Sequence, residues 1–422
     1  MKSNPSASDL VEHLFRQHAG RMLATLTRLL GSRHLALAEE VVQEALATAL
    51  QQWPFQGVPE NPSAWLIQVA KNRALDRLRR DRAFAERERD VAATFEARAS
   101  TAIGGGPGVS RPFADDELCM MFMACHPDIP RESRIALTLK TVGGFSVPEI
   151  ARAFLAQEAT IAQRLVRVKK LVRERDIPLD LPDRREMPER LDSVLEVLYL
   201  MFNEGYAAHA GESLVRHDLV DEAIRLTRML ARHPDTETPK THALLALMLL
   251  QAARIPARQG AAGELFVLED QDRRLWDRAL IADGLRHLDA SARGEVVSAY
   301  HLQAGIAAAH AVAPAYEATD WTEIVSLYDA LLDVEPTPIV ALNRAIAVAK
   351  ARGAEAGLHA LAGLRDDPTL SRYYLFHATL GELSREAGDL AAAARHYEAA
   401  LTLPCSEPAR RFLRNKLAIL GA

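Results

Sequence analysis

The spacing of apolar residues is the feature that most constrains the fold of this chain. Along almost all of its 422 residues, apolar side chains recur three and four positions apart, and alternating runs of β-branched residues are rare. Because an α-helix turns once in 3.6 residues, this spacing gathers the apolar side chains on one helical face. The pattern predicts an all-α protein.

Two segments interrupt the helical pattern. Residues 83–113 pass from AERERD to STAIGGGPGVSRP, a string rich in Gly, Ser and Pro that predicts a flexible linker. Residues 176–190 contain three prolines, which stop helices. The interruptions predict three folded blocks, at residues 9–82, 114–176 and 187–422.

The third block carries a weak internal repeat. A Gly or Thr followed by a small or acidic residue recurs at Thr319, Gly353 and Gly388, which is close to the period of a solenoid of helical hairpins. The best unit, FHATLGELSREAGDLAAAARHYEAALTLP, places Leu380 and Gly381 on its first helix. Its second helix carries Ala393, Tyr397 and Ala400.

Composition excludes several classes of protein. With 49% apolar and 25% charged residues the chain is neither disordered nor fibrous. Three cysteines, Cys119, Cys125 and Cys405, are too few for a disulfide framework and too scattered for a zinc site. No apolar signal core is present, and the longest apolar run, 243–250, is too short to cross a membrane. We expect a cytoplasmic protein with no membrane partner, metal or cofactor.

The net charge of −5 is unevenly divided. Residues 1–185 hold 27 Lys and Arg against 23 acids, whereas the remainder holds 24 against 33. The two halves therefore favour different partners, and any nucleic-acid contact must come from local basic clusters.

One such cluster is FSVPEIARAFLAQEATIAQRLVRVKK, residues 145–170. Ser146 is a good helix cap, so a first helix is expected to end near Phe154 and a second to begin after a turn at 155–157. On the second helix, Ile161, Leu165, Val168 and Val172 form an inward stripe, while Thr160, Gln163, Arg164, Arg167 and Lys170 face out. Such an outer face suits the DNA major groove, although a merely solvated face is the alternative.

A second cluster is NPSAWLIQVAKNRALDRLRRDR, residues 61–82. Asn61 and Pro62 predict a helix start. The expected apolar face is Ile67, Ala70, Ala74 and Leu78, and the expected polar face is Gln68, Asn72, Asp76 and Arg79 with flanking basic residues. The preceding block carries Glu39, Glu40, Gln43 and Glu44 on one side of a helix, which either is solvated or docks on a basic protein surface.

These strings together resemble a known family. AEEVVQEALATAL, PSAWLIQVAKNRALDRLRR and RIALTLKTVGGFSVPEIARAFLAQEATIAQRLVRVKK are similar to regions 2 and 4 of the extracytoplasmic-function sigma factors of bacterial RNA polymerase, in the sigma-70 family. The remainder, with FNEGYAAHAGESLVRHDLVDEAIRLTRML and TDWTEIVSLYDALL, resembles the group that carries a tetratricopeptide-like carboxy-terminal extension.

The resemblance implies partners and site residues. Glu39, Glu40, Gln43 and Glu44 would bind the β′ coiled coil of polymerase core, whose β flap would be a second contact. Promoter DNA would be read at the minus-10 element by Asn61, Trp65, Gln68, Lys71, Asn72, Arg73, Asp76, Arg77, Arg79 and Arg80. The minus-35 element would be read by Glu158, Thr160, Gln163, Arg164, Arg167, Lys169 and Lys170. Melted bases would be captured near the loop at 54–61.

Other interpretations remain open from the sequence. The chain could be a helix-turn-helix regulator that binds operators alone, or an enzyme with its active site in the last block, for which we find no convergent catalytic groups. That block could regulate through an intramolecular or protein partner, or be an inert appendage. In NEGY, Gly205 is expected to cap a helix, and in EDQDRRLWD the acids are expected to pair locally with Arg273 and Arg274.

Overall fold

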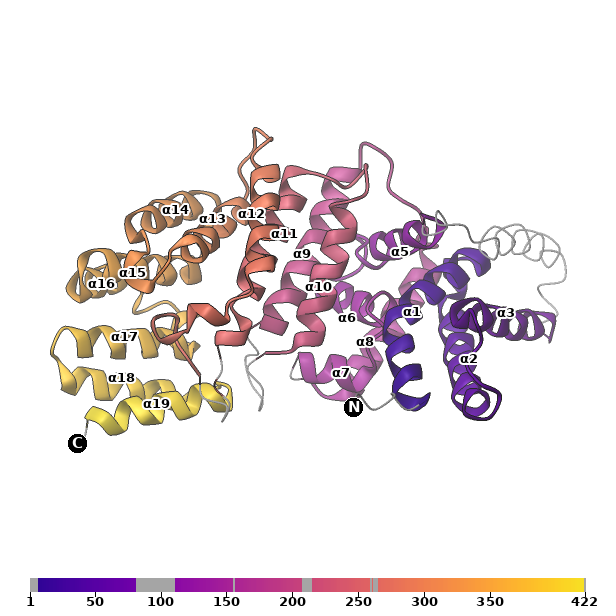
Figure 1. The fold of residues 1–422 in the computed structure, drawn as a ribbon, viewed down its shortest axis with the longest axis horizontal. Helices are drawn as coiled ribbons and strands as arrows, with labels where there is room; N and C mark the ends of the chain where they lie inside the picture. The colour runs from indigo at the N-terminus through magenta and orange to yellow at the C-terminus, as the bar shows by residue number, and fades with distance from the viewer. Residues whose placement is uncertain are drawn as a thin grey trace. The chain divides into compact units, whose positions relative to one another are not determined.

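The structure is a computed structural model of the chain, and it describes residues 7–80, 111–154, 156–206, 215–258, 260 and 265–420. Within these ranges the regular structure is helical and no strand is formed, which confirms the all-α prediction. The chain divides into two compact units, residues 1–200 and 201–422, and the division falls inside one long helix (Figure 1).

The first unit contains α-helices of 7 to 24 residues around a small core. Its elements are α1 (Ala7–Leu30), η1 (Ser32–His34), α2 (Leu35–Gln56), α3 (Pro62–Arg80), α5 (Arg111–Ala124), α6 (Arg131–Thr141), α7 (Val147–Ala153), α8 (Glu158–Glu174) and most of α9 (Met187–Tyr206). Of the predicted linker, residues 83–110 lie outside the described residues. Its last three residues, 111–113, instead form the first turn of α5.

The core of the first unit lies along α5. The side chains from Leu118 to Cys125 are all buried, and Phe122 has no exposed surface. Arg190 of α9 donates a hydrogen bond to the carbonyl oxygen of Phe122 at 2.8 Å, and Arg134 of α6 donates to the Ser193 hydroxyl at 3.3 Å. The part of α9 up to Leu200 therefore completes this core.

The second unit is a succession of packed helices. These are α10 (His217–Leu230), α11 (Pro239–Ala252), α12 (Arg278–Ser291), α13 (Ala299–Val312), α14 (Trp321–Val334), α15 (Pro338–Arg352), α16 (Ala354–Leu361), α17 (Tyr374–Glu386), α18 (Leu390–Thr402) and α19 (Glu407–Leu420). Short 3-10 turns connect them: η3 (Ile255–Ala257), η4 (Leu268–Asp270), η5 (Arg273–Leu275), η6 (Tyr316–Ala318), η7 (Ala362–Leu364) and η8 (Leu370–Arg372). The apolar run 243–250 is buried within α11 and is core, and no described helix is long and apolar enough to cross a membrane.

Capping residues and glycines set the helix ends of the second unit. The side chains of Asp320 and Asp389 each accept a backbone N–H from the first turn of the following helix, at 2.9 and 2.8 Å. Gly353 and Gly388 have φ values of 94° and 87°, a conformation that only glycine adopts without strain. Adjacent helices of the unit pack against each other.

Helices α17 and α18 show why the best repeat unit has its sequence. A β-carbon on Gly381 would lie 2.8 Å from the ring of Tyr397, so the absence of a side chain on α17 admits the aromatic ring of α18. Tyr397 is 1% exposed, and Ala393 and Ala400 are fully buried beside it. Small and large side chains thus interlock across this pair.

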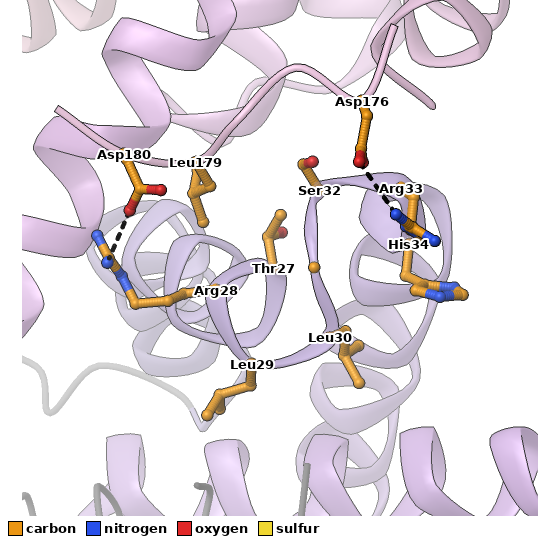
Figure 2. A pocket seen from close by; sticks show the side chains of 11 residues that line it. Thr27, Arg28, Leu29, Leu30, Ser32, Arg33, His34, Asp176, Leu179 and Asp180 are labelled. Atoms are coloured by element: carbon orange, nitrogen blue, oxygen red, sulfur yellow. Dashed lines mark hydrogen bonds and ion pairs between the residues drawn. The ribbon is translucent and has the colours of Figure 1, made fainter. Parts of the chain in front are cut away.

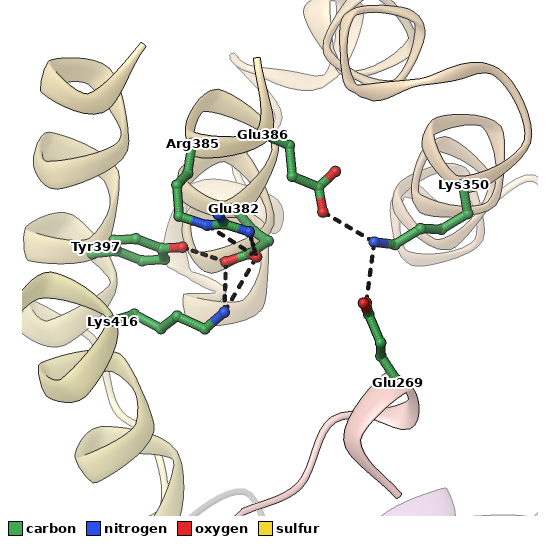
Figure 3. Close-up of polar contacts among 7 residues, drawn as sticks. All are labelled: Glu269, Lys350, Glu382, Arg385, Glu386, Tyr397 and Lys416. Atoms are coloured by element: carbon green, nitrogen blue, oxygen red, sulfur yellow. Dashed lines mark hydrogen bonds and ion pairs between the residues drawn. The ribbon is translucent and has the colours of Figure 1, made fainter. Parts of the chain in front are cut away.

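A polar cluster joins the last three helices (Figure 3). The Glu382 carboxylate accepts hydrogen bonds from Arg385 on its own helix and from the Tyr397 hydroxyl on α18, and Lys416 of α19 lies 3.2 Å away. Nearby, Lys350 of α15 contacts Glu386 at 3.0 Å and Glu269 at 3.7 Å. One carboxylate therefore links α17, α18 and α19.

Two local expectations were wrong. Gly205 does not cap a helix, because α9 continues through Tyr206; its role is close packing, since a β-carbon there would lie 2.8 Å from Leu219 of α10. Arg274 does pair locally with Asp272, but Arg273 turns inward and donates to the carbonyl oxygens of residues 310 and 313 at 2.7 and 2.6 Å. The spacing of residues in the sequence does not distinguish the inward side chain of Arg273 from the outward side chain of Arg274.

Candidate functional site

The helix pair α7–α8 forms where the sequence predicts it. The Ser146 hydroxyl accepts the backbone N–H of Glu149 at 3.3 Å, and the Glu149 carboxylate accepts the backbone N–H of Ser146 at 2.8 Å, which is a capping box at the start of α7. Helix α8 begins at Glu158 and buries the predicted stripe of Ile161, Leu165, Val168 and Val172. The opposite face of α8 does not pack against the core.

The outer face of α8 carries donors and acceptors. Glu158, Thr160, Gln163, Arg167 and Lys170 are exposed, as expected. Two of the basic side chains already have partners: Arg164 contacts Glu132 at 2.8 Å, and Lys170 contacts Glu174 at 3.6 Å. Both acidic partners are themselves exposed, so a phosphate or base edge could replace them at little cost.

Helix α3 presents most of its predicted polar face. The Asn61 side chain caps it by accepting the backbone N–H of Ala64 at 3.1 Å. Gln68, Asn72 and Asp76 are exposed, and Gln68 donates to Asn72 at 3.0 Å. The side chains of Arg79 and Arg80 lie outside the described ones.

Two details of α3 differ from the sequence prediction. Lys71 is only 8% exposed, so it is not on the outer face that we expected to meet DNA. Leu66, at 1% exposure, takes the inward position that we assigned to Ile67. The helix is rotated slightly from the predicted orientation because its buried side is set by contacts with α2 and α1, which the sequence spacing does not encode.

An aromatic group lies between α2 and α3. Trp53 is buried and meets Trp65 edge to face, with ring centroids 5.5 Å apart. Phe55, on the last turn of α2, is 89% exposed, and Gly57 ends that turn with a φ of 83°. An exposed ring beside a polar helix is a platform on which an unpaired base can stack.

The acidic side of α2 is largely occupied by arginines of α3. Glu44 accepts from Arg73 at 2.8 Å and also from Arg77, which reaches Glu40 at 2.5 Å. The hydrogen bond from Arg77 lowers the pKa of the Glu40 carboxyl. The predicted polymerase-binding and DNA-binding residues thus meet within one domain, and Arg73 and Arg77 are less available to DNA than the sequence suggested.

Glu39 pairs with the other predicted DNA-binding segment. Its carboxylate lies 3.3 Å from Lys140 of α6 and also binds Lys169 of α8, while Gln43 stays exposed. Lys140 was not singled out from the sequence, because its contact with Glu39 joins residues about a hundred positions apart. The structure thereby brings the block at 9–82 and the block at 114–176 into contact.

A hollow of about 390 Å³ lies where the end of α1 and η1 face the chain after α8. Figure 2 shows Arg28 reaching Asp180 on one side, at 3.6 Å, and Arg33 reaching Asp176 on the other, at 3.0 Å. Basic and acidic groups neutralise each other across the hollow, so it has no clear preference for a charged ligand.

The cysteines do not form a reactive or metal-binding site. All three are free and buried, and burial raises the pKa of the Cys125 thiol to about 11. Among the described residues, no group of three His, Cys, Asp or Glu side chains could hold a metal ion.

Comparisons with known proteins match two parts of the chain to different family models. A family model for sigma-70 region 2 matches residues 14–84, and a model for a family of unknown function, DUF6596, matches residues 190–292. An uncharacterized protein of Rhizobium meliloti (strain 1021) is 41% identical over 391 residues, which cover 92% of this chain and 91% of that protein.

A second relative is a named sigma factor. The RNA polymerase sigma factor CarQ of Myxococcus xanthus is 32% identical over 147 residues, which cover 34% of this chain and 76% of that protein. No solved structure matches the chain.

Proposed function

Because the chain belongs to the sigma-70 family of RNA polymerase sigma factors, we propose that it binds the polymerase core and directs transcription initiation at specific promoters, with no catalysis of its own. Two observations together carry the proposal. A sigma-70 region 2 model matches α1–α3, and the helix pair α7–α8 has a second helix with a polar outer face. We also propose that the chain belongs to the extracytoplasmic-function group of these factors.

The proposed partners follow the chemistry of each face. The acidic side of α2, with Glu39, Glu40, Gln43 and Glu44, would dock on the β′ coiled coil of core, and the α6–α8 domain on the β flap. Arg77 and Arg73 neutralise part of that side, so core binding has to compete with pairs that already exist.

The minus-10 element would be read and opened by α3 and the preceding loop. Gln68, Asn72 and Asp76 offer exposed polar groups, and the Phe55 ring offers an apolar surface for a base that has left the helix. The minus-35 element would be read by α8, where Gln163 suits adenine, Arg164 suits guanine, and Arg167 and Lys170 suit phosphates.

Arg164 gives this assignment a direct test. If it pairs with a guanine, Arg164→Ala should weaken binding of the polymerase holoenzyme by about 1 to 3 kcal/mol and relax specificity at one base of the minus-35 element. Glu132→Gln is the matched control: it frees Arg164 from its pair and should not reduce affinity. An equal loss on every promoter would make Arg164 a phosphate contact.

The carboxy-terminal block, 187–422, would regulate the factor through a tetratricopeptide-like surface. Run-off transcription with purified core would compare the full chain with a chain truncated after Tyr206. The truncation keeps α9, because Arg190 and Ser193 belong to the first unit's core. Unchanged promoter-dependent transcription would refute a regulatory role, and absence of core binding by the full chain would favour a regulator that binds operators alone.

A further inference from the structure

We propose that the second unit binds an oxyanion, the phosphate or carboxylate group of a small ligand, at Arg254 and Arg273 beside Trp276. The site lies where the turns after α11 approach η5 and the end of α13, within the second unit. The inference goes beyond the proposed function and does not depend on it, because neither polymerase nor DNA takes part.

Four arginines of this region bind neutral acceptors in place of acids. Arg254 donates to two side-chain amide oxygens, at 3.3 and 3.4 Å. Arg258 and Arg278 each donate to a backbone carbonyl oxygen, and Arg273 donates to two. With the residues that the structure describes, none of the four forms an ion pair, so their positive charges are not neutralised locally.

Other arginines of the same unit behave differently. Arg228, Arg344 and Arg385 each pair with a carboxylate. Acids are also plentiful, since residues 186–422 hold 33 Asp and Glu against 24 Lys and Arg. Charged groups that leave water are usually paired, so a partly buried group of unpaired arginines is unusual in such an acidic unit.

The surrounding titratable groups respond to this positive charge. Burial lowers the pKa of the Arg273 guanidinium, and the charge of Arg254 lowers it further. Burial also lowers the pKa of His310 to about 3, and the charges of Arg254 and Arg273 contribute to that shift. A negative charge bound among these groups would relieve the repulsion between them.

Two buried nitrogen atoms at this place lack hydrogen-bond partners among the described residues. Trp276 is 2% exposed and its indole Nε1–H has no acceptor, and the Nδ1 atom of buried His310 is also unpartnered. The guanidinium carbons of Arg273 and Arg254 lie 4.6 and 5.4 Å from the centroid of the Trp276 ring. Because buried N–H groups nearly always have an acceptor, the site lacks one that an oxyanion would supply.

The donors at the site select an oxyanion over other ligands. A guanidinium and an indole can only donate hydrogen bonds, and the planar fork of arginine matches the paired oxygens of a carboxylate or phosphate. Arg254 is partly exposed, so an anion can reach it from solvent. Arg273 is buried and held by carbonyl oxygens, so it supplies charge from a fixed position.

The test is isothermal titration calorimetry of the full-length chain with inorganic phosphate, and separately with acetate, at an ionic strength held constant with sodium chloride. Arg254→Gln removes the solvent-facing charge of the site. Arg274→Gln is the matched control, because Arg274 lies in the same segment but is exposed and pairs with Asp272. Trp276→Phe removes the indole N–H and keeps an aromatic ring beside the arginines.

We expect saturable binding by the wild-type chain and about tenfold weaker binding by Arg254→Gln, since a hydrogen bond between charged groups is lost. Arg274→Gln should bind as wild type does. Trp276→Phe should bind more weakly and should lose the change in tryptophan fluorescence that accompanies binding. Circular dichroism melting establishes which variants fold. Should Arg254→Gln not fold, Arg254→Lys keeps the charge, removes the fork and should still weaken binding.

The two anions distinguish the sources of the oxyanion. Saturation by phosphate alone would identify a phosphate ligand, and saturation by acetate alone a carboxylate ligand; either result supports the site. No saturable binding of either anion would overturn the inference. Binding that Arg254→Gln leaves unchanged, or that Arg254→Gln and Arg274→Gln weaken equally, would also overturn it, because the anion would then be held by basic side chains elsewhere.

Discussion

The Glu382 cluster predicts a stability effect that depends on pH. Burial alone would raise the pKa of this carboxyl, but the hydrogen bonds from Arg385 and Tyr397 and the charge of Lys416 outweigh burial and lower it to about 2. We consider Glu382→Gln, which keeps the size of the side chain and removes its charge.

The magnitude follows from the pKa difference. An unfolded Glu titrates near 4.5, and one pKa unit corresponds to about 1.4 kcal/mol. The shift to about 2 therefore corresponds to roughly 3 kcal/mol at pH 7, which solvent screening of a side chain 30% exposed reduces to about 2 kcal/mol. Since the folded pKa is depressed, this stabilisation is present above pH 4.5 and is lost as the pH falls toward 2.

The assay is urea unfolding of the full chain, followed by hydrogen-exchange mass spectrometry on peptides of α17 and α18. We expect Glu382→Gln to lower the free energy of unfolding by about 2 kcal/mol at pH 7, and by roughly half as much near pH 3. Glu386→Gln is the control on the same helix. Lys350 would keep its contact with Glu269, so the loss should stay below about 1 kcal/mol.

A loss that is equal at both pH values would refute the reasoning, because it would show that the carboxylate acts through packing and not through its charge. Equal losses in the free energy of unfolding for Glu382→Gln and Glu386→Gln would also refute it. The three partners of Glu382 would then stabilise the chain no more than one exposed ion pair does.

Three further predictions concern single substitutions in the two units. Arg273→Ala should destabilise the second unit by about 3 kcal/mol in thermal or urea unfolding, because it removes buried hydrogen bonds, whereas Arg274→Ala should change stability by less than about 0.5 kcal/mol; similar losses would contradict the inward placement of Arg273. Gly381→Ala should cost about 1 kcal/mol net in the same assay, since the clash with Tyr397 exceeds the gain in helix propensity, and a stabilised variant would show that the ring moves freely. Phe55→Ala should leave the melting temperature unchanged and lower permanganate reactivity of thymines in the minus-10 region; unchanged reactivity would remove the ring from promoter melting.

Local rules were sufficient for much of the site. The capping box at Ser146 and Glu149, the cap at Asn61, and the buried stripe of α8 depend on residues within one or two turns of each other. Such short-range preferences can be read from sequence because the interacting groups are already neighbours along the chain.

The predictions that were wrong concern residues whose surroundings are set by distant parts of the chain. Lys71 was expected to face outward and is buried, and Arg273 was expected to pair locally and is bonded to carbonyls about forty residues away. In each case the residue has the charge of a surface group, and only the position of a distant helix shows that it is enclosed.

By itself, the sequence determined the helical class, the starts of α3, α7 and α8, and the polar outer face of α8, because helical periodicity and capping act over a few residues. Only the tertiary structure decided which charges remain available to partners. Arg77 meets Glu40, and Lys169 meets Glu39, through pairs separated by tens to more than a hundred positions. Spacing along a chain carries no information about which distant charges will meet, since that depends on how the helices pack.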